Sequence, residues 1–80
     1  TADHLSRACR AAAGQHALEI LHERRVREAK RRLAHTGASV GAVAAAVGYP
    51  DPAYFSRFFA RATGLSPLAY RLAVREGQRP

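Results

Sequence analysis

The sequence predicts an all-α fold in which short amphipathic helices are grouped around one long helix. Apolar residues recur at positions i, i+3, i+4 and i+7 along most of the chain, which is the spacing of a helix that buries one face. No segment shows the alternation of apolar and polar residues that is typical of a strand. The 80 residues are 48% hydrophobic, which is enough for one small helical core.

The first part of the chain predicts a short helix and then a long one. Thr1 is a candidate cap and Gly14 a candidate stop, so the first helix is expected over residues 2–13. The long helix is expected over residues 17–35 and ends at Thr36-Gly37. At 1.5 Å per residue it is roughly 28 Å long.

The next two helices have the pattern of a helix-turn-helix. Ser39 is a candidate cap for a short helix over residues 40–47, which Gly48 closes. After a short turn, Asp51 can cap a second helix that begins at Pro52 and ends before Gly64. Its two faces differ. The expected core stripe is Phe55, Phe58, Phe59 and Ala62, and the opposite face carries Ala53, Ser56, Arg57, Ala60 and Arg61.

A last helix is expected to begin at Ser66-Pro67 and to run to about Glu76. The predicted organisation is then a recognition helix of a first, incomplete helix-turn-helix (residues 1–14), a linker helix (15–36), a second helix-turn-helix with its closing helix (37–77) and a tail (78–80).

An internal repeat relates the first helix to the helix after Asp51. With a shift of 50 positions, Ser6-Arg7 falls on Ser56-Arg57 and Gly14 falls on Gly64. Two similar basic helices joined by a rigid helix suggest two contact sites on one partner. The major groove of B-DNA returns to the same face after about 34–36 Å, a distance of the same order as the linker helix.

The charge of the chain indicates a polyanionic partner. The net charge is +7 and the pI is about 11.1, which favours nucleic acid over a small substrate, with RNA or a membrane surface as alternatives. One cysteine excludes an internal disulfide and favours a reducing compartment, so we expect a cytoplasmic, nucleoid-associated protein.

Catalytic and metal-binding patterns are missing from the sequence. The histidines have no metal-ligand spacing, and Cys9 lies in an apolar stripe, where a structural role is the simpler interpretation. There is no glycine-rich phosphate loop and no nucleophile elbow. We therefore expect no enzyme activity, no catalytic residue, no metal and no cofactor. For Tyr54, packing against Phe58 is favoured over contact with a base.

The chain resembles the DNA-binding domain of the AraC/XylS family of bacterial transcription regulators. The resemblance runs from Leu5 to about Arg71. It rests on a signature run with its spacing intact, which comprises Arg25-Val26, Ala29, Leu33, Thr36, Ser39-Val40, Val43-Ala44, Val47-Gly48-Tyr49, Tyr54-Phe55-Ser56-Arg57, Phe59, Gly64, Ser66-Pro67 and Tyr70-Arg71.

The resemblance implies a homeodomain-like fold with two helix-turn-helix units, each of which places one recognition helix in successive major grooves. It also implies that the first unit is truncated at its front, since family members have further helices before this recognition helix. The implied base contacts are Asp3, Ser6 and Arg7 in the first recognition helix and Ala53, Ser56 and Arg57 in the second. The implied phosphate contacts are Arg10, Ser39 and Arg61.

The expected partner is double-stranded DNA, with RNA polymerase as a further candidate and an effector domain outside this chain. Two other functions remain as alternatives. One is a nonspecific basic nucleic-acid-binding module, and the other is a DNA-binding appendage of a larger enzyme. Exposed aromatic platforms for stacking single-stranded bases are not evident, because the aromatic residues fit core stripes.

Overall fold

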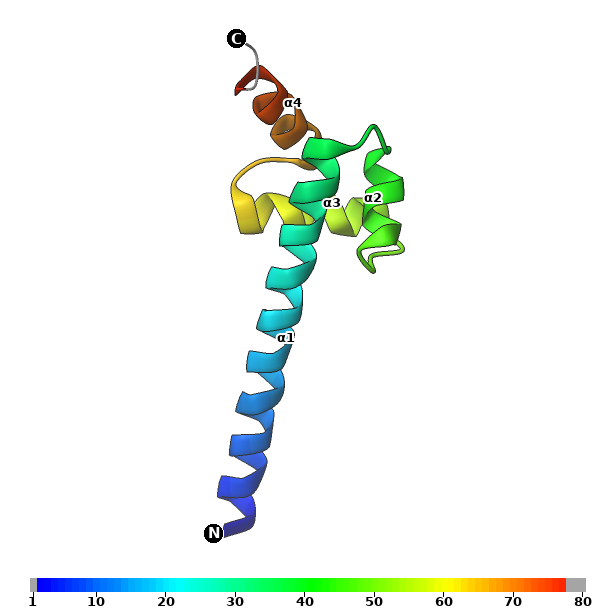
Figure 1. Ribbon diagram of the computed structural model, residues 1–80. Coiled ribbons are helices and arrows are strands. Elements are labelled where there is room, and N and C mark those ends of the chain that lie inside the picture. Colours follow the sequence, from blue (N-terminus) through cyan, green and yellow to red (C-terminus); the bar gives the residue numbers. More distant parts are fainter. Residues whose placement is uncertain (1, 78–80) are drawn as a thin grey trace.

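The computed structural model describes the backbone of residues 2–77 and the side chains of residues 10–77. Its elements are α1 (Ala2–His35), α2 (Val40–Ala46), α3 (Pro52–Thr63) and α4 (Pro67–Gly77). Figure 1 shows α1 as a straight rod, with the other helices gathered around its C-terminal end. The molecule is accordingly elongated, at 62 × 26 × 16 Å. The predicted all-α class with a helix-turn-helix is confirmed, whereas the predicted cap Thr1 and the tail 78–80 lie outside the described residues.

The predicted end of a helix at Gly14 is wrong, because α1 runs through this position without a break. Gly14 does not adopt the positive φ that marks Gly64, and residues 10–20 are exposed, so nothing packs there to stop the helix. Its neighbours Ala12 and Ala13 are good helix formers. The helix can therefore continue through Gly14, because a glycine within a helix lowers its stability by only about 1 kcal/mol relative to alanine.

The boundaries of the other helices follow the predicted caps. Ser39 Oγ accepts from the Ala42 amide at 3.1 Å, and Asp51 Oδ1 accepts from the Ala53 amide at 3.0 Å. Ser66 Oγ accepts from the Ala69 amide at 3.1 Å. Gly64 ends α3 at φ +83°, in the left-handed region where glycine avoids the clash of a side chain. Each cap satisfies a backbone group that the helix itself leaves unpaired.

The core lies where α2, α3 and α4 meet the last turns of α1. It consists of Ala29, Leu33, Val43, Ala44, Val47, Tyr49, Phe55 and Phe59. The expected stripe of α3 is only partly confirmed, since Phe55 and Phe59 are buried but Phe58 is half-buried and Ala62 is exposed. α1 extends well beyond this core (Figure 1), and its residues 10–20 are exposed.

A buried arginine ties α4 to the end of α1. Arg71 is 8% exposed, and its Nε donates to the Leu33 carbonyl at 3.0 Å. Its Nη2 donates to the carbonyls of Thr36 and Ala38 in the loop before α2. These are carbonyls at a helix end, which a planar guanidinium can satisfy together. Arg71 therefore fixes α4 against α1 and shapes the loop that leads into the helix-turn-helix.

Candidate nucleic-acid interface

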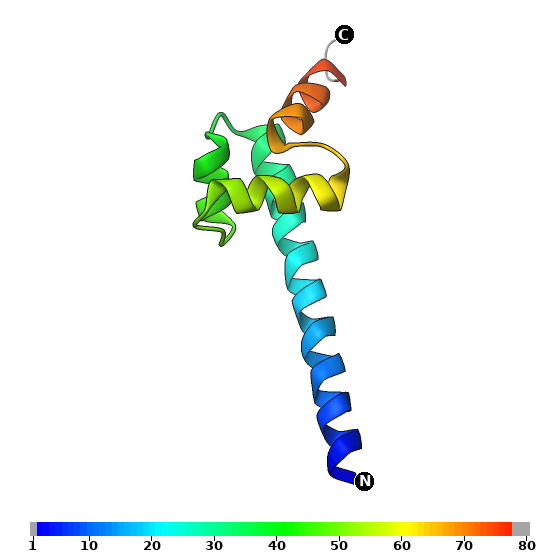
Figure 2. The same cartoon turned by 180° about the vertical axis from the view of Figure 1, so that it is seen from behind.

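α3 is held so that one face is buried and the other is open to solvent. It lies across α1 in both views, on the side that Figure 2 turns toward the reader. Phe55 and Phe59 are about 1% and 0% exposed and anchor its inner face in the core. Its N-terminus follows a turn after α2, so that α2 and α3 together form the helix-turn-helix. The open face of a helix fixed in this way can enter a groove of a partner.

The open face of α3 brings together four of the residues predicted to contact DNA. Ala53, Arg57 and Arg61 are exposed, and Ser56 is half-buried. Ala53 and Ala60 have short side chains, which let the helix backbone approach a partner closely. The guanidinium of Arg57 has five donors in a fixed fork, which suits a guanine edge or a phosphate.

The other predicted contacts lie apart from α3. Ser39 is exposed at the start of α2, where its Oγ already accepts from the Ala42 amide and keeps its own proton to donate. Arg10 is exposed on the projecting half of α1. Asp3, Ser6 and Arg7 belong to α1, for which the structure describes only the backbone at these positions.

A cluster of aromatic rings surrounds the turn between α2 and α3. Tyr49 lies at its centre, with ring centroids 5.7 Å from Phe55, 5.5 Å from Phe58 and 5.9 Å from Tyr54. Tyr54 also stacks on Phe58, as predicted, but it stays 44% exposed beside the open face of α3. Burial raises the pKa of the Tyr49 hydroxyl above its ordinary value, and the neighbouring Arg25 acts in the opposite direction.

Two residues of α1 complete this cluster, and the sequence analysis did not single them out for it. His22 Nδ1 lies 2.7 Å from the Tyr49 hydroxyl, in a hydrogen bond whose donor depends on the imidazole tautomer. Arg25 Cζ lies 5.1 Å from the centroid of the Tyr49 ring. His22 and Arg25 are three residues apart, which places both on one side of α1. This spacing is the only feature of the sequence that could have indicated a shared role for them.

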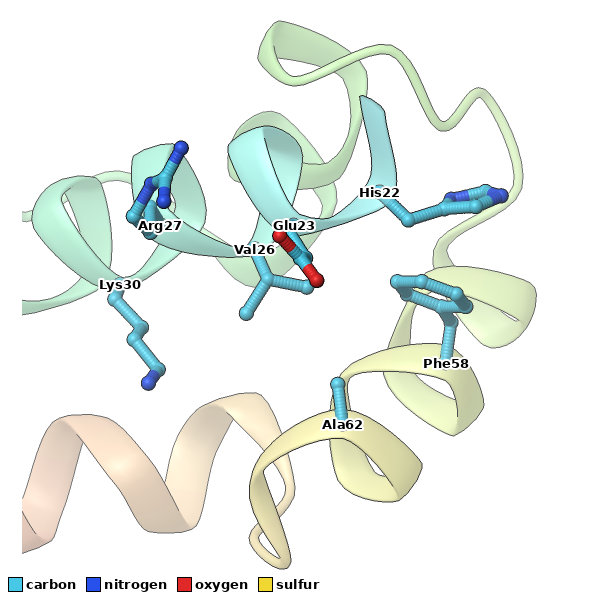
Figure 3. A pocket seen from close by; sticks show the side chains of 7 residues that line it. All are labelled: His22, Glu23, Val26, Arg27, Lys30, Phe58 and Ala62. Atoms are coloured by element: carbon cyan, nitrogen blue, oxygen red, sulfur yellow. The ribbon is translucent and has the colours of Figure 1, made fainter. Parts of the chain in front are cut away.

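An open pocket of about 300 Å³ lies between α1 and α3, next to the aromatic cluster. Figure 3 shows the side chains that line it, which include the apolar Val26, Phe58 and Ala62 and the charged Glu23, Arg27 and Lys30. His22 faces Phe58, with ring centroids 4.6 Å apart. These side chains include no nucleophile with an adjacent base, so the pocket carries no catalytic constellation.

The residues that the structure describes contain no group of three or more His, Cys, Asp or Glu side chains placed to hold a metal ion. Within the same residues, no helix is both long and apolar enough to cross a membrane.

One acidic side chain on α1 is neutralised locally. Glu28 pairs with Arg31 and with Arg32, whose Nε lies 2.9 Å from Glu28 Oε1. The hydrogen bond from Arg31 is the main cause that lowers the pKa of Glu28 to about 2. Glu28 therefore belongs to an ion-paired surface of α1. Such exposed pairs contribute little to stability.

Comparison with known proteins finds a helix-turn-helix family and three transcription regulators. A family model described as a helix-turn-helix domain matches residues 1–73. The chain is 38% identical over 72 residues to an uncharacterized HTH-type transcriptional regulator, YisR, of Bacillus subtilis (strain 168), covering 90% of this chain and 25% of the relative. It is 58% identical over 40 residues to the MmsAB operon regulatory protein of Pseudomonas aeruginosa, covering 50% of this chain and 13% of the relative.

A third relative is the raffinose operon transcriptional regulatory protein RafR of Pediococcus pentosaceus, 39% identical over 56 residues, which are 70% of this chain and 20% of the relative. The chain therefore spans at most about a quarter of the length of these relatives. No solved structure gives a significant match.

Proposed function

We propose that this chain, which belongs to the AraC-type helix-turn-helix family, binds double-stranded DNA in a sequence-specific manner as part of a bacterial transcription regulator. The relatives are named as transcription regulators, which supports DNA binding by a regulator rather than an enzyme activity. The net charge of +7 supports the same partner, because DNA is a polyanion.

The observation that carries the proposal is the open face of α3. Its inner face is locked by Phe55 and Phe59, its start is capped by Asp51, and its outer face presents short residues around Arg57. A rigid helix with this outer face fits a B-DNA major groove, in which the base edges carry a distinct pattern of donors and acceptors.

The roles of the side chains follow from their places on α3 and around it. We assign base contacts to Ala53, Ser56 and Arg57, with Arg57 as the main donor to a base edge. Arg61 lies one turn further along α3 and is assigned to a phosphate, as is Ser39 at the start of α2.

We further propose a second recognition element at the start of α1. Asp3, Ser6 and Arg7 would contact bases there, and Arg10 a phosphate. Ser6 lies 23 residues before Ala29 in the continuous helix α1, which corresponds to roughly 35 Å along the axis. This length supports contacts one turn of DNA apart. A separate recognition helix would still have to bend away from the axis of α1.

A role in transcription regulation also has consequences for the whole protein. We propose that a domain outside this chain senses the effector, that RNA polymerase is a further partner, and that the protein acts in the cytoplasm at the nucleoid. A nonspecific nucleic-acid-binding module and an appendage of a larger enzyme are the competing functions, because a high positive charge alone would serve either of them.

Selection of bound duplexes from a random DNA library, at about physiological salt and with RNA as competitor, tests the proposal. We expect enrichment of a short half-site by the 80-residue chain, and of two half-sites about one helical turn apart by a version extended at its N-terminus. Binding without an enriched sequence would leave only the nonspecific alternative. Preference for the RNA competitor would reject double-stranded DNA as the partner.

A further inference from the structure

The turn between α2 and α3 determines the direction in which α3, the proposed recognition helix, leaves α2. Gly48 adopts φ +100° there, and the Tyr49 amide donates to the Ala44 carbonyl at 2.8 Å. Tyr49 itself is only 4% exposed. Any residue that fixes this turn against the rest of the fold also fixes the orientation of α3.

Arg25 of α1 occupies the space beside this turn. A Cβ atom placed on Gly48 would lie 3.1 Å from Arg25 Cζ and 3.3 Å from its Nε and Nη2. The same guanidinium lies over the Tyr49 ring, with Cζ 5.1 Å from the centroid. Arg25 is therefore packed between the Gly48 backbone and the Tyr49 ring, and it is half-buried.

His22 holds the same ring from one turn earlier on α1. Its Nδ1 lies 2.7 Å from the Tyr49 hydroxyl, and its ring is nearly parallel to the Tyr49 ring at 6.2 Å. α1 also meets α3 directly, since the rings of His22 and Phe58 lie 4.6 Å apart. The turn is therefore a second place, besides this direct contact, where α1 can set the position of α3.

We propose that Arg25 is a positioning residue for DNA recognition, one that holds Tyr49 and the turn of the helix-turn-helix and does not bind a phosphate. This inference rests on the proposed function. It gives Arg25 a structural role at the turn, in contrast to arginines that bind DNA through their positive charge. Together, Arg25 and His22 clamp Tyr49 so that α3 meets the groove at a fixed angle.

The charge-conserving variant Arg25→Lys separates these two tasks. Lysine keeps the positive charge but loses the planar group that stacks on Tyr49. We expect the affinity of Arg25→Lys for a selected duplex to fall about tenfold, with unchanged affinity for random duplex and an unchanged salt slope. The adjacent exposed Arg24→Lys is the matched control and should leave both affinities unchanged.

Three results distinguish the outcomes. If Arg25→Lys binds the selected duplex as tightly as the wild type does, Arg25 has no positioning role. If Arg25→Met weakens selected and random duplexes equally and lowers the salt slope by about one, Arg25 is a phosphate contact. If the wild-type protein enriches no sequence, it is the proposed function that fails.

A measurement on the wild-type protein covers the case in which the variants do not fold. The Nε–H resonance of Arg25 should change little when the selected duplex is added, because this group stays packed on Tyr49. The resonances of Arg57 and Arg61 should move. A large shift of the Arg25 signal together with those of Arg57 and Arg61 would overturn the inference.

Discussion

Arginine serves different purposes at different positions of this chain, and burial separates them. Arg71 is buried and donates to three carbonyls, Arg25 is half-buried against Tyr49, and Arg57 and Arg61 are exposed on α3. A guanidinium is always charged and has donors in a plane, so its role depends on what surrounds it. The net charge of +7 therefore overstates the number of groups free to contact a polyanion.

Replacement of Arg71 by methionine should destabilise the fold. It would leave the carbonyls of Leu33, Thr36 and Ala38 without their donor, at a cost of about 1–3 kcal/mol in the free energy of unfolding. Denaturant unfolding followed by circular dichroism measures this. Arg75→Met in the same helix is the control, because Arg75 is exposed. Equal midpoints for the two variants would show that the buried hydrogen bonds add nothing.

Arg61→Ala should weaken the binding of all duplexes alike. A phosphate contact carries no sequence information, and its loss should reduce the slope of log K against log salt by about one. Titrations of a selected and a random duplex at several salt concentrations measure both quantities. A loss confined to the selected duplex would instead place Arg61 at a base edge.

At the scale of the elements, α1 and α3 differ in what stabilises them. α3 is fixed by Asp51, Gly64 and two buried phenylalanines, whereas residues 10–20 of α1 are exposed and depend on their own helix propensity. The sequence predicted the caps of α2, α3 and α4 well, because capping is a local property of a few residues. It failed at Gly14, because a glycine ends a helix only where the surroundings favour the turn.

Phe59→Ala should cost about 3–5 kcal/mol in the free energy of unfolding, because it opens a cavity at a side chain that is fully buried. Denaturant unfolding measures the loss. The control is Leu68→Ala on α4, where the side chain is 55% exposed and a change within about 0.5 kcal/mol is expected. A parent-like unfolding curve for Phe59→Ala would contradict the core described above.

Gly14→Ala should stabilise the helix in the part of α1 that projects from the core. A Cβ at this position meets no atom within 4 Å, and alanine is favoured over glycine in a helix by about 1 kcal/mol. The helical signal in circular dichroism should rise, and it should fall for the reverse change Ala13→Gly. An unchanged signal in both variants would mean that α1 is not continuous across this position in solution.

At the scale of the whole molecule, a rod projects from a compact helix-turn-helix (Figure 1). The fold class and the family were predictable, because helical periodicity and the signature run both lie within the sequence. The aromatic clamp on Tyr49 was not, since it brings His22 and Arg25 to a turn more than 20 residues away. Contacts of this range depend on the packed core and leave no local pattern.

The central claim is that α3 contacts base edges through Arg57, and the base preference of Arg57→Ala tests it most directly. Duplexes are selected from one random library with the wild type, with Arg57→Ala and with Arg61→Ala as the control. The account predicts that Arg57→Ala loses preference at one base pair and about 1–3 kcal/mol of specific affinity, while Arg61→Ala keeps the wild-type preference. An Arg57→Ala profile identical to that of the wild type would contradict the account.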